Sequence, residues 1–258
     1  MTAHSYYGSV EITRDMAGGH TVVPGLSVSG LTKVAVWTVL GSKAISTATT
    51  VASMISDFDN AARIWAGKYY SDDNISFGGQ LMQGLSRSTW EILQSWGGYN
   101  YSQIRNIAGD VDRVDYLGGA TFVTNEGAAG GAWGVSLGNY LNLNINGGII
   151  GSFSEWVTNN PLYMHEYGHT FDSRGYGPAY LFKVGIPSAR SAKRSTQISG
   201  EPQGVETHDF QWYEMNANRY AARYFGRYYG VNWNRPFGLP GDTIETYYPR
   251  RTRIRTRR

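Results

Sequence analysis

The stretch "NNPLYMHEYGHTFDSRGYG", Asn159 to Gly177, places two of the chain's five histidines four residues apart. Asn160 followed by Pro161 predicts a helix start. The Asn side chain can accept from the first free N–H groups of the helix, and Pro has no backbone N–H that would need a partner. Four residues rotate a helix by roughly 400°, so His165 and His169 project from one face, one turn apart. The pair constrains the fold, since a shared metal ion needs a third ligand from another element.

Glu166 lies roughly 100° around the predicted helix from His165, where its carboxylate can reach a water on such an ion without being a ligand. A carboxylate there can take a proton from that water, because the ion lowers the pKa of the water toward neutrality. The alternative is a buried helix whose histidines bond only to backbone groups. An extended motif with a third histidine six residues on is excluded, because Gly175 occupies that position.

The predicted third ligand is Glu214, within a helix predicted from about His208 to Tyr229. Glu214 falls inside an apolar stripe at spacings of three and four, formed by Phe210, Ala217, Ala221, Tyr224, Phe225 and Tyr228. A carboxylate on a buried face is costly unless it is paired or coordinates a metal. The small alanines beside it would let the histidine helix approach closely. The alternative for Glu214 is a buried salt bridge, to Arg219 or Arg223.

Other side chains have predicted supporting roles. Asn218, one turn after Glu214, is placed to hydrogen-bond a ligand. His208 is a rival ligand, but on one continuous helix it lies roughly 240° from Glu214 and does not share its face. We therefore expect His208 to be a donor near the reacting carbonyl, with Tyr176 and Tyr213 as weaker choices.

Composition restricts the remaining chemistry. The 258 residues are 41% hydrophobic and 14% aromatic, as in a folded globular protein. No cysteine is present, which excludes disulfides and thiolate sites and leaves His, Asp and Glu as the strong ligands. The run from Gly127 to Ser154 is uncharged but rich in Gly and Asn, so we expect no membrane insertion and a protein that is soluble.

The last nine residues, "RRTRIRTRR", hold six arginines, against a formal net charge of +3 for the whole chain. The rest of the chain is therefore slightly acidic. Such a run can bind nucleic acid, and strongly salt-dependent binding lost on deleting it would reveal that role. An exposed, disordered terminus is the more ordinary account.

The order of periodic segments predicts an α+β domain with a small sheet packed beside helices. Helical spacing occurs in Leu31–Tyr70, in Gly78–Asn100 with a stop at Gly97-Gly98, and around Ala179 to Val184. Short half-buried strands are expected within 113–125 and 133–146, where apolar and polar residues alternate between Gly-rich turns. We expect residues 1–44 to be a loose lead-in or a junction to a larger protein, 45–249 to be the domain, and 250–258 to be a disordered Arg-rich tail.

The residues resemble the gluzincin branch of zinc metallopeptidases, with "HEYGH" on one helix and "EMNAN" on a second, where Glu214 follows His169 by 45 residues. The resemblance implies a zincin-like fold, a peptide or protein substrate, and Zn²⁺ held by His165, His169 and Glu214. Glu166 is then the general base and acid, and Asn218 supports a ligand where gluzincins more usually carry Asp.

A longer resemblance covers roughly Ile45 to Arg250. Segments such as "GYNYSQIRNIAGDVDRVDYLGGATFVTNE" and "NPLYMHEYGHTFDSRGYGPAYLFKVGIPS" are similar to C-terminal domains after RHS/YD-type repeats in large Bacteroidetes surface proteins. This implies an extracellular or cell-surface location within a longer polypeptide. It also leaves a second hypothesis open, a catalytically silent module whose zinc is structural or absent.

In zincins the strand before the metal helix binds extended substrate along its edge. By the same resemblance, Gly138 to Ile145 would bind substrate here, and a core strand is an equally good interpretation of those residues.

Overall fold

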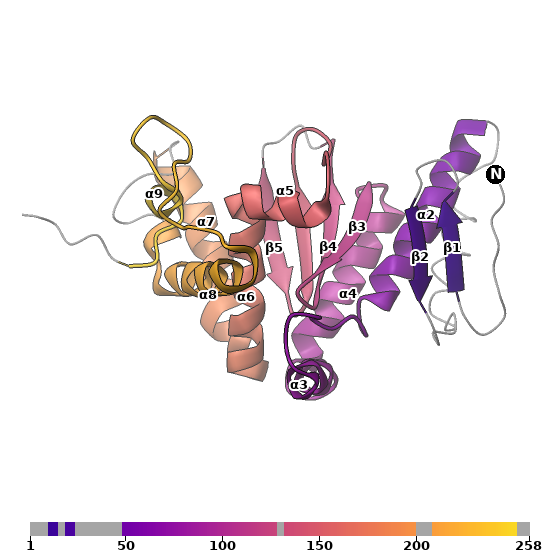
Figure 1. Ribbon diagram of the computed structural model, residues 1–258, viewed down its shortest axis with the longest axis horizontal. Helices are drawn as coiled ribbons and strands as arrows, with labels where there is room; N and C mark the ends of the chain where they lie inside the picture. The colour runs from indigo at the N-terminus through magenta and orange to yellow at the C-terminus, as the bar shows by residue number, and fades with distance from the viewer. Residues whose placement is uncertain (1–9, 15–18, 24–47, 128–131, 200–207, 252–258) are drawn as a thin grey trace, which may run out of the picture.

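The computed structural model describes residues 10–14, 19–23, 48–127, 132–199 and 208–251. A four-stranded sheet lies between groups of helices, which confirms the predicted α+β class (Figure 1). The helices are α2 (Ala48–Ala66), α3 (Phe77–Ser88), α4 (Ile92–Ile107), α5 (Phe153–Asn159), α6 (Pro161–Tyr176), α7 (Ile186–Ser199), α8 (Trp212–Tyr229) and α9 (Ile244–Tyr247). Short turns η1 (Gly177–Ala179) and η2 (Leu181–Gly185) join α6 to α7, and η3 (His208–Phe210) precedes α8.

The sheet has the spatial order β3-β4-β6-β5. Its strands are β3 (Arg113–Leu117), β4 (Ala120–Asn125), β5 (Trp133–Leu137) and β6 (Tyr140–Asn144). β4 and β6 are parallel, and the two outer pairs are antiparallel. The β3–β4 turn is Gly118-Gly119, where φ is 63° and 82°. Both values favour glycine, and a two-residue turn with positive φ at both positions matches the twist of a hairpin.

Alternate side chains of the central strands enter two different cores. Phe122 and Leu141 pack on one face with residues of α6 and α8. Val123 and Tyr140, their neighbours along the strands, pack on the other face with Ile64 of α2 and residues of α4. Successive residues of a strand point to opposite faces of the sheet, so a sheet covered on both faces places apolar side chains in both cores. The structure is therefore layered, with α2 and α4 on one side of the sheet and α6 and α8 on the other (Figure 1).

Helices α6 and α8 pack closely because their contacting residues are small. A Cβ placed on Gly168 would lie 2.1 Å from the backbone oxygen of Ala217. Ala217 and Ala221 are both fully buried. The close approach expected from the two alanines is confirmed. On α6, the absence of a side chain at Gly168 makes the same approach possible.

Several predicted element boundaries were wrong. The predicted helix at 78–100 is two helices, α3 and α4, and Gly97-Gly98 lie inside α4 instead of ending it. A Cβ on Gly98 would meet the backbone oxygen of Leu137 at 2.2 Å, so this glycine lets α4 approach the β5–β6 hairpin. The long helix begins at Trp212, which leaves His208 in a separate 3-10 turn. Helices α5 and α7 were not predicted.

The predicted terminal segments fall largely outside the described residues. Within 1–44 the structure describes β1 (Val10–Arg14) and β2 (Gly19–Val23), which pair antiparallel. Of the Arg-rich run, Arg250 and Arg251 are described and 252–258 are not. No helix in the described part of the chain is both long and apolar enough to span a membrane.

Candidate metal centre

Three predicted ligands meet between α6 and α8. The Oε2 atom of Glu214 lies 3.1 Å from Nε2 of His165 and 3.0 Å from Nε2 of His169. One ligand atom from each residue lies within 4.8 Å of the other two. The three residues are 9%, 5% and 1% exposed, with Glu214 the most buried. The prediction that two histidines and a distant carboxylate converge is confirmed.

The donor set fits a divalent cation better than it fits an ordinary buried ion pair. Oε1 of Glu214 is buried without a hydrogen-bond partner among the described residues, and the nearest ion-pair contact to it is His208 Nδ1 at 3.5 Å. The expected alternative partners, Arg219 and Arg223, do not pair with Glu214. Two imidazole nitrogens and one carboxylate oxygen suit zinc, for which three protein ligands leave one position open.

The charges of the three groups are tightly linked. Burial alone raises the pKa of the Glu214 carboxyl, but the two imidazoles, His169 first, outweigh it and hold that pKa well below its usual value. Burial alone lowers the pKa of His169, but the carboxylates of Glu214 and Asp172 hold it well above its usual value. A cation bound here replaces protons on the imidazoles as the partner of the buried carboxylate.

Asn218 fixes the tautomer of His165. Nδ2 of Asn218 donates to the carbonyl of Pro249 at 2.9 Å, so its Oδ1 is the atom that faces His165. That oxygen lies 2.8 Å from Nδ1 of His165 and can only accept. Nδ1 therefore carries a proton, and Nε2 is the nitrogen that faces Glu214: it donates to that carboxylate when protonated, and can bind a cation once it has lost that proton. This is the supporting position that the sequence predicted for Asn218.

Asp172 lies beside the second histidine. Its Oδ2 atom is 3.4 Å from Nδ1 of His169, while its Oδ1 accepts from Asn216. The carboxylate is 1% exposed. A carboxylate behind a ligating imidazole orients the ring and raises its basicity.

Glu166 points to the edge strand of the sheet. Its Oε2 atom lies 2.6 Å from Oγ of Ser136, which is also 2.9 Å from the Glu166 backbone oxygen. A Cβ on Gly134 would lie 2.5 Å from the Glu166 side chain, so only glycine leaves room for the carboxylate there. Both Gly134 and Ser136 belong to β5, and Glu166 is therefore held between the histidine helix and that strand.

The other predicted catalytic residues lie at different distances from the triad. His208 approaches it: Nδ1 is 3.5 Å from Oε1 of Glu214 and 2.7 Å from Oγ of Ser191. The prediction that His208 does not share a face with Glu214 was wrong, because the chain turns between η3 and α8. Tyr176 ends α6, where its ring contacts Trp212, and no described hydrogen bond or ion pair joins it to the triad.

Tyr213 has no described bond to the triad: its hydroxyl donates to Pro187 O at 3.1 Å or to Ser191 Oγ at 3.0 Å. Ser191 in turn contacts His208. Sequence reasoning missed Tyr248, whose ring centroid is 5.6 Å from that of His165 and whose pKa is raised by burial. It also missed Ser136 and Asp172. Only Asp172 carried a local signal, since it stands one helical turn after His169.

The strand expected to bind substrate at its edge is an internal one. β6 is hydrogen-bonded to β4 on one side and β5 on the other, so the core-strand interpretation of Gly138 to Ile145 is correct. The strand at that end of the sheet is β5, which pairs only with β6 among the described strands.

Comparison with known proteins gives no family for this chain: no family model, no curated protein and no solved structure matches it.

Proposed function

We propose that the protein is a zinc-dependent peptide-bond hydrolase of the gluzincin type, acting as an endopeptidase. The observation that carries the proposal is the convergence of His165, His169 and Glu214 from two helices, with Glu166 next to the first ligand. Zinc held by these three side chains would supply Lewis acidity, which polarises a carbonyl group and acidifies a water molecule. The rest of the chemistry falls to residues of this chain.

Glu166 is the proposed general base and acid. Its carboxylate accepts a proton from the attacking water and delivers it to the leaving amine, which is the role a carboxylate beside the ligands can fill. The Ser136 hydroxyl restrains one carboxylate oxygen, Oε2. His208, with Nδ1 held by Ser191, is the proposed donor toward the reacting carbonyl; Tyr176, which has no described bond to the triad, remains the weaker choice.

The edge of β5 is the proposed peptide-binding surface. β5 lies at the end of the sheet, and its residues Gly134 and Ser136 contact Glu166. The Ser136 carbonyl accepts from the Tyr180 hydroxyl at 3.0 Å, so the proposed surface is the more exposed part of the strand, Trp133 to Val135. An extended peptide that adds to a sheet edge gains backbone hydrogen bonds and is held parallel to the strand. A peptide bound there would have its backbone beside the general base.

A second candidate is a catalytically silent module of a large surface or toxin-like protein of the RHS/YD-repeat kind, with zinc in a structural role. The burial of the ligands and the approach of His208 to Glu214 favour it, since structural sites are closed. Under either candidate we propose an extracellular or cell-surface location.

Metal analysis followed by a cleavage assay tests the proposal. Purified protein is analysed for bound metal, and wild type and Glu166→Gln are then incubated with a peptide library read by mass spectrometry. We expect about one equivalent of zinc in both proteins. We expect cleavage by wild type only, because the substituted glutamine keeps the shape of the side chain but cannot accept the proton.

Equal cleavage by both proteins would remove Glu166 from its role. Bound zinc with no cleavage by wild type would favour the silent module. Absence of any metal after zinc loading would exclude the peptidase and a structural zinc site, and would leave only a silent module without zinc.

A further inference from the structure

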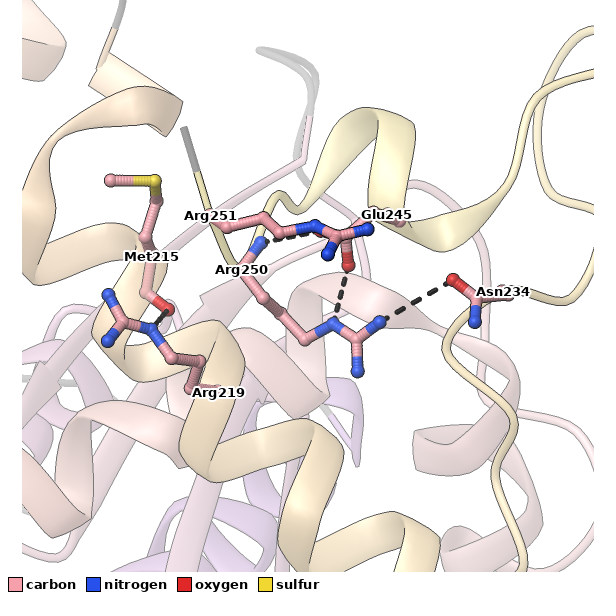
Figure 2. A pocket seen from close by; sticks show the side chains of 6 residues that line it. All are labelled: Met215, Arg219, Asn234, Glu245, Arg250 and Arg251. Atoms are coloured by element: carbon pink, nitrogen blue, oxygen red, sulfur yellow. Dashed lines mark hydrogen bonds and ion pairs between the residues drawn. The ribbon is translucent and has the colours of Figure 1, made fainter. Parts of the chain in front are cut away.

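A pocket of about 560 Å³ lies beside α8, and three of its six lining residues are arginines. Its lining comes from α8 on one side and from the segment after α8 on the other (Figure 2). The lining residues are Met215, Arg219, Asn234, Glu245, Arg250 and Arg251. None of them has a part in the chemistry proposed above.

Two of the three guanidinium groups have no carboxylate partner among the described residues. Glu245 is already neutralised by Arg250, which donates to it from both its backbone N (3.1 Å) and its Nε (2.5 Å) (Figure 2). Arg219 donates from Nε to the carbonyl of Met215 at 3.3 Å. Within the same part of the chain, no ion pair involves Arg219 or Arg251. The pocket therefore carries an excess of positive charge that an anionic ligand would balance.

The walls of this pocket are built from the segments that hold the metal ligands. Arg219 directly follows Asn218, which hydrogen-bonds both His165 and Pro249. Arg250 directly follows Pro249 in the chain. Arg219 and Arg250 therefore each stand one residue after a member of the hydrogen-bonded pair, Asn218 and Pro249, that supports His165.

We propose that this pocket binds a carboxylate of a peptide, from an acidic side chain or a free C-terminus. Guanidinium groups recognise carboxylates through paired, charge-assisted hydrogen bonds, and Arg219 and Arg251 are free to make them. The pocket then selects substrates that carry an acidic group outside the bond that is cleaved. That selection rests on the proposed peptidase function, whereas binding of the carboxylate does not.

Binding is measured by calorimetry on zinc-loaded protein carrying Glu166→Gln, so that no peptide is turned over. The probes are acetylated hexa-alanine amides with one glutamate at each position in turn, and a matched set with glutamine. Acetylated hexa-alanine with a free C-terminal carboxylate, set against its amide, tests the other source of the charge. The same titrations are repeated with Arg219→Gln and Arg251→Gln combined, and with Arg223→Gln, an exposed arginine of α8 outside the pocket.

We expect at least one acidic peptide to bind about fivefold to tenfold more tightly than its neutral match. The preference is lost in the Arg219→Gln, Arg251→Gln protein and kept in Arg223→Gln. A ratio near one for every pair, a preference that survives the double substitution, or no binding of any acidic peptide at millimolar concentration overturns the inference.

Cleavage by the wild-type protein separates this inference from the proposed function. If acidic peptides bind through the arginines but are never cleaved, the peptidase proposal fails and the pocket stands. If acidic and neutral peptides are cleaved with equal kcat/KM, the peptidase proposal stands and the pocket inference fails.

Discussion

Replacing Gly168 by alanine tests whether the close contact of α6 and α8 builds the metal centre. The new Cβ would lie 2.1 Å from the oxygen and 2.6 Å from the carbonyl carbon of Ala217, both of them backbone atoms. Neither helix backbone can rotate away as a side chain would. The helices must therefore separate by about 1 Å to reach van der Waals contact.

Two opposing free energies decide the outcome. Alanine favours the helix over glycine by about 1 kcal/mol, while inserting an atom into a packed interface costs about 3 kcal/mol where backbone must move. The expected net loss of unfolding free energy is about 2 kcal/mol, equivalent to a Tm lowered by roughly 4–8 °C for a chain of this size. Gly175→Ala is the matched control on the same helix, because a Cβ there meets nothing within 4 Å. It should be neutral or stabilising by up to about 1 kcal/mol.

Urea unfolding of the metal-free proteins measures both effects, and zinc affinity is then measured by competition with a chelating dye. Since His169 and Glu214 come from the two helices that separate, Gly168→Ala should also bind zinc about tenfold or more weakly, while Gly175→Ala should not. Equal stability and equal zinc affinity of the two variants would refute the argument that this contact positions the ligands.

Three further outcomes follow from the site. Asn218→Leu removes the acceptor that keeps the proton on Nδ1 of His165, and should weaken zinc binding about 10- to 100-fold by chelator competition; unchanged affinity would show that the tautomer is set otherwise. Ser136→Ala frees the Glu166 carboxylate, and should lower kcat about tenfold with zinc content unchanged, so lost zinc instead would mean that Ser136 supports the fold of the centre. Removal of zinc by dialysis against a chelator should lower the free energy of unfolding by about 3 kcal/mol relative to protein at a free zinc concentration about 100-fold above Kd, and a Tm indifferent to zinc would contradict a metal centre among these residues.

The histidine helix could be predicted because its signals are local. Asn160-Pro161 marks the start of α6, and the spacing of His165 and His169 fixes their common face. The strands β3 and β4 were also visible, since Gly118-Gly119 stands as a turn between two alternating runs. Each of these features depends only on neighbours within about one turn of chain.

Features that depend on packing between distant segments could not be predicted in the same way. Gly97-Gly98 looks like a helix stop, yet Gly98 is the point where α4 touches the β5–β6 hairpin. A glycine that ends a helix and one that lets it approach a strand are the same letter in the sequence. Likewise, β5 and β6 were both predicted as half-buried strands, which is wrong for β6, because it lies inside the sheet and four of its five residues are buried. Only the sheet order shows that β5 is the edge.

His208 shows how one helix boundary changes a chemical conclusion. Treated as the first residue of a continuous helix, it points roughly 240° away from Glu214. In the structure the helix begins at Trp212, and the 3-10 turn brings the ring to 3.5 Å from the Glu214 carboxylate. Helix ends are the least predictable part of an element, and here such an end decides whether a histidine belongs to the site.

The supporting bond to Pro249 makes the segment after α8 a part of the metal centre. From its place on α8, Asn218 can accept from Nδ1 of His165 with its Oδ1. Its side-chain amide could also rotate, and would then present the donor Nδ2 to the ring instead. The Pro249 carbonyl removes that choice, because it accepts only from Nδ2. Tyr248 contacts the same imidazole through its ring. The ligands are therefore specified by short motifs, whereas the proton on Nδ1 of His165 is placed by residues in other segments of the chain.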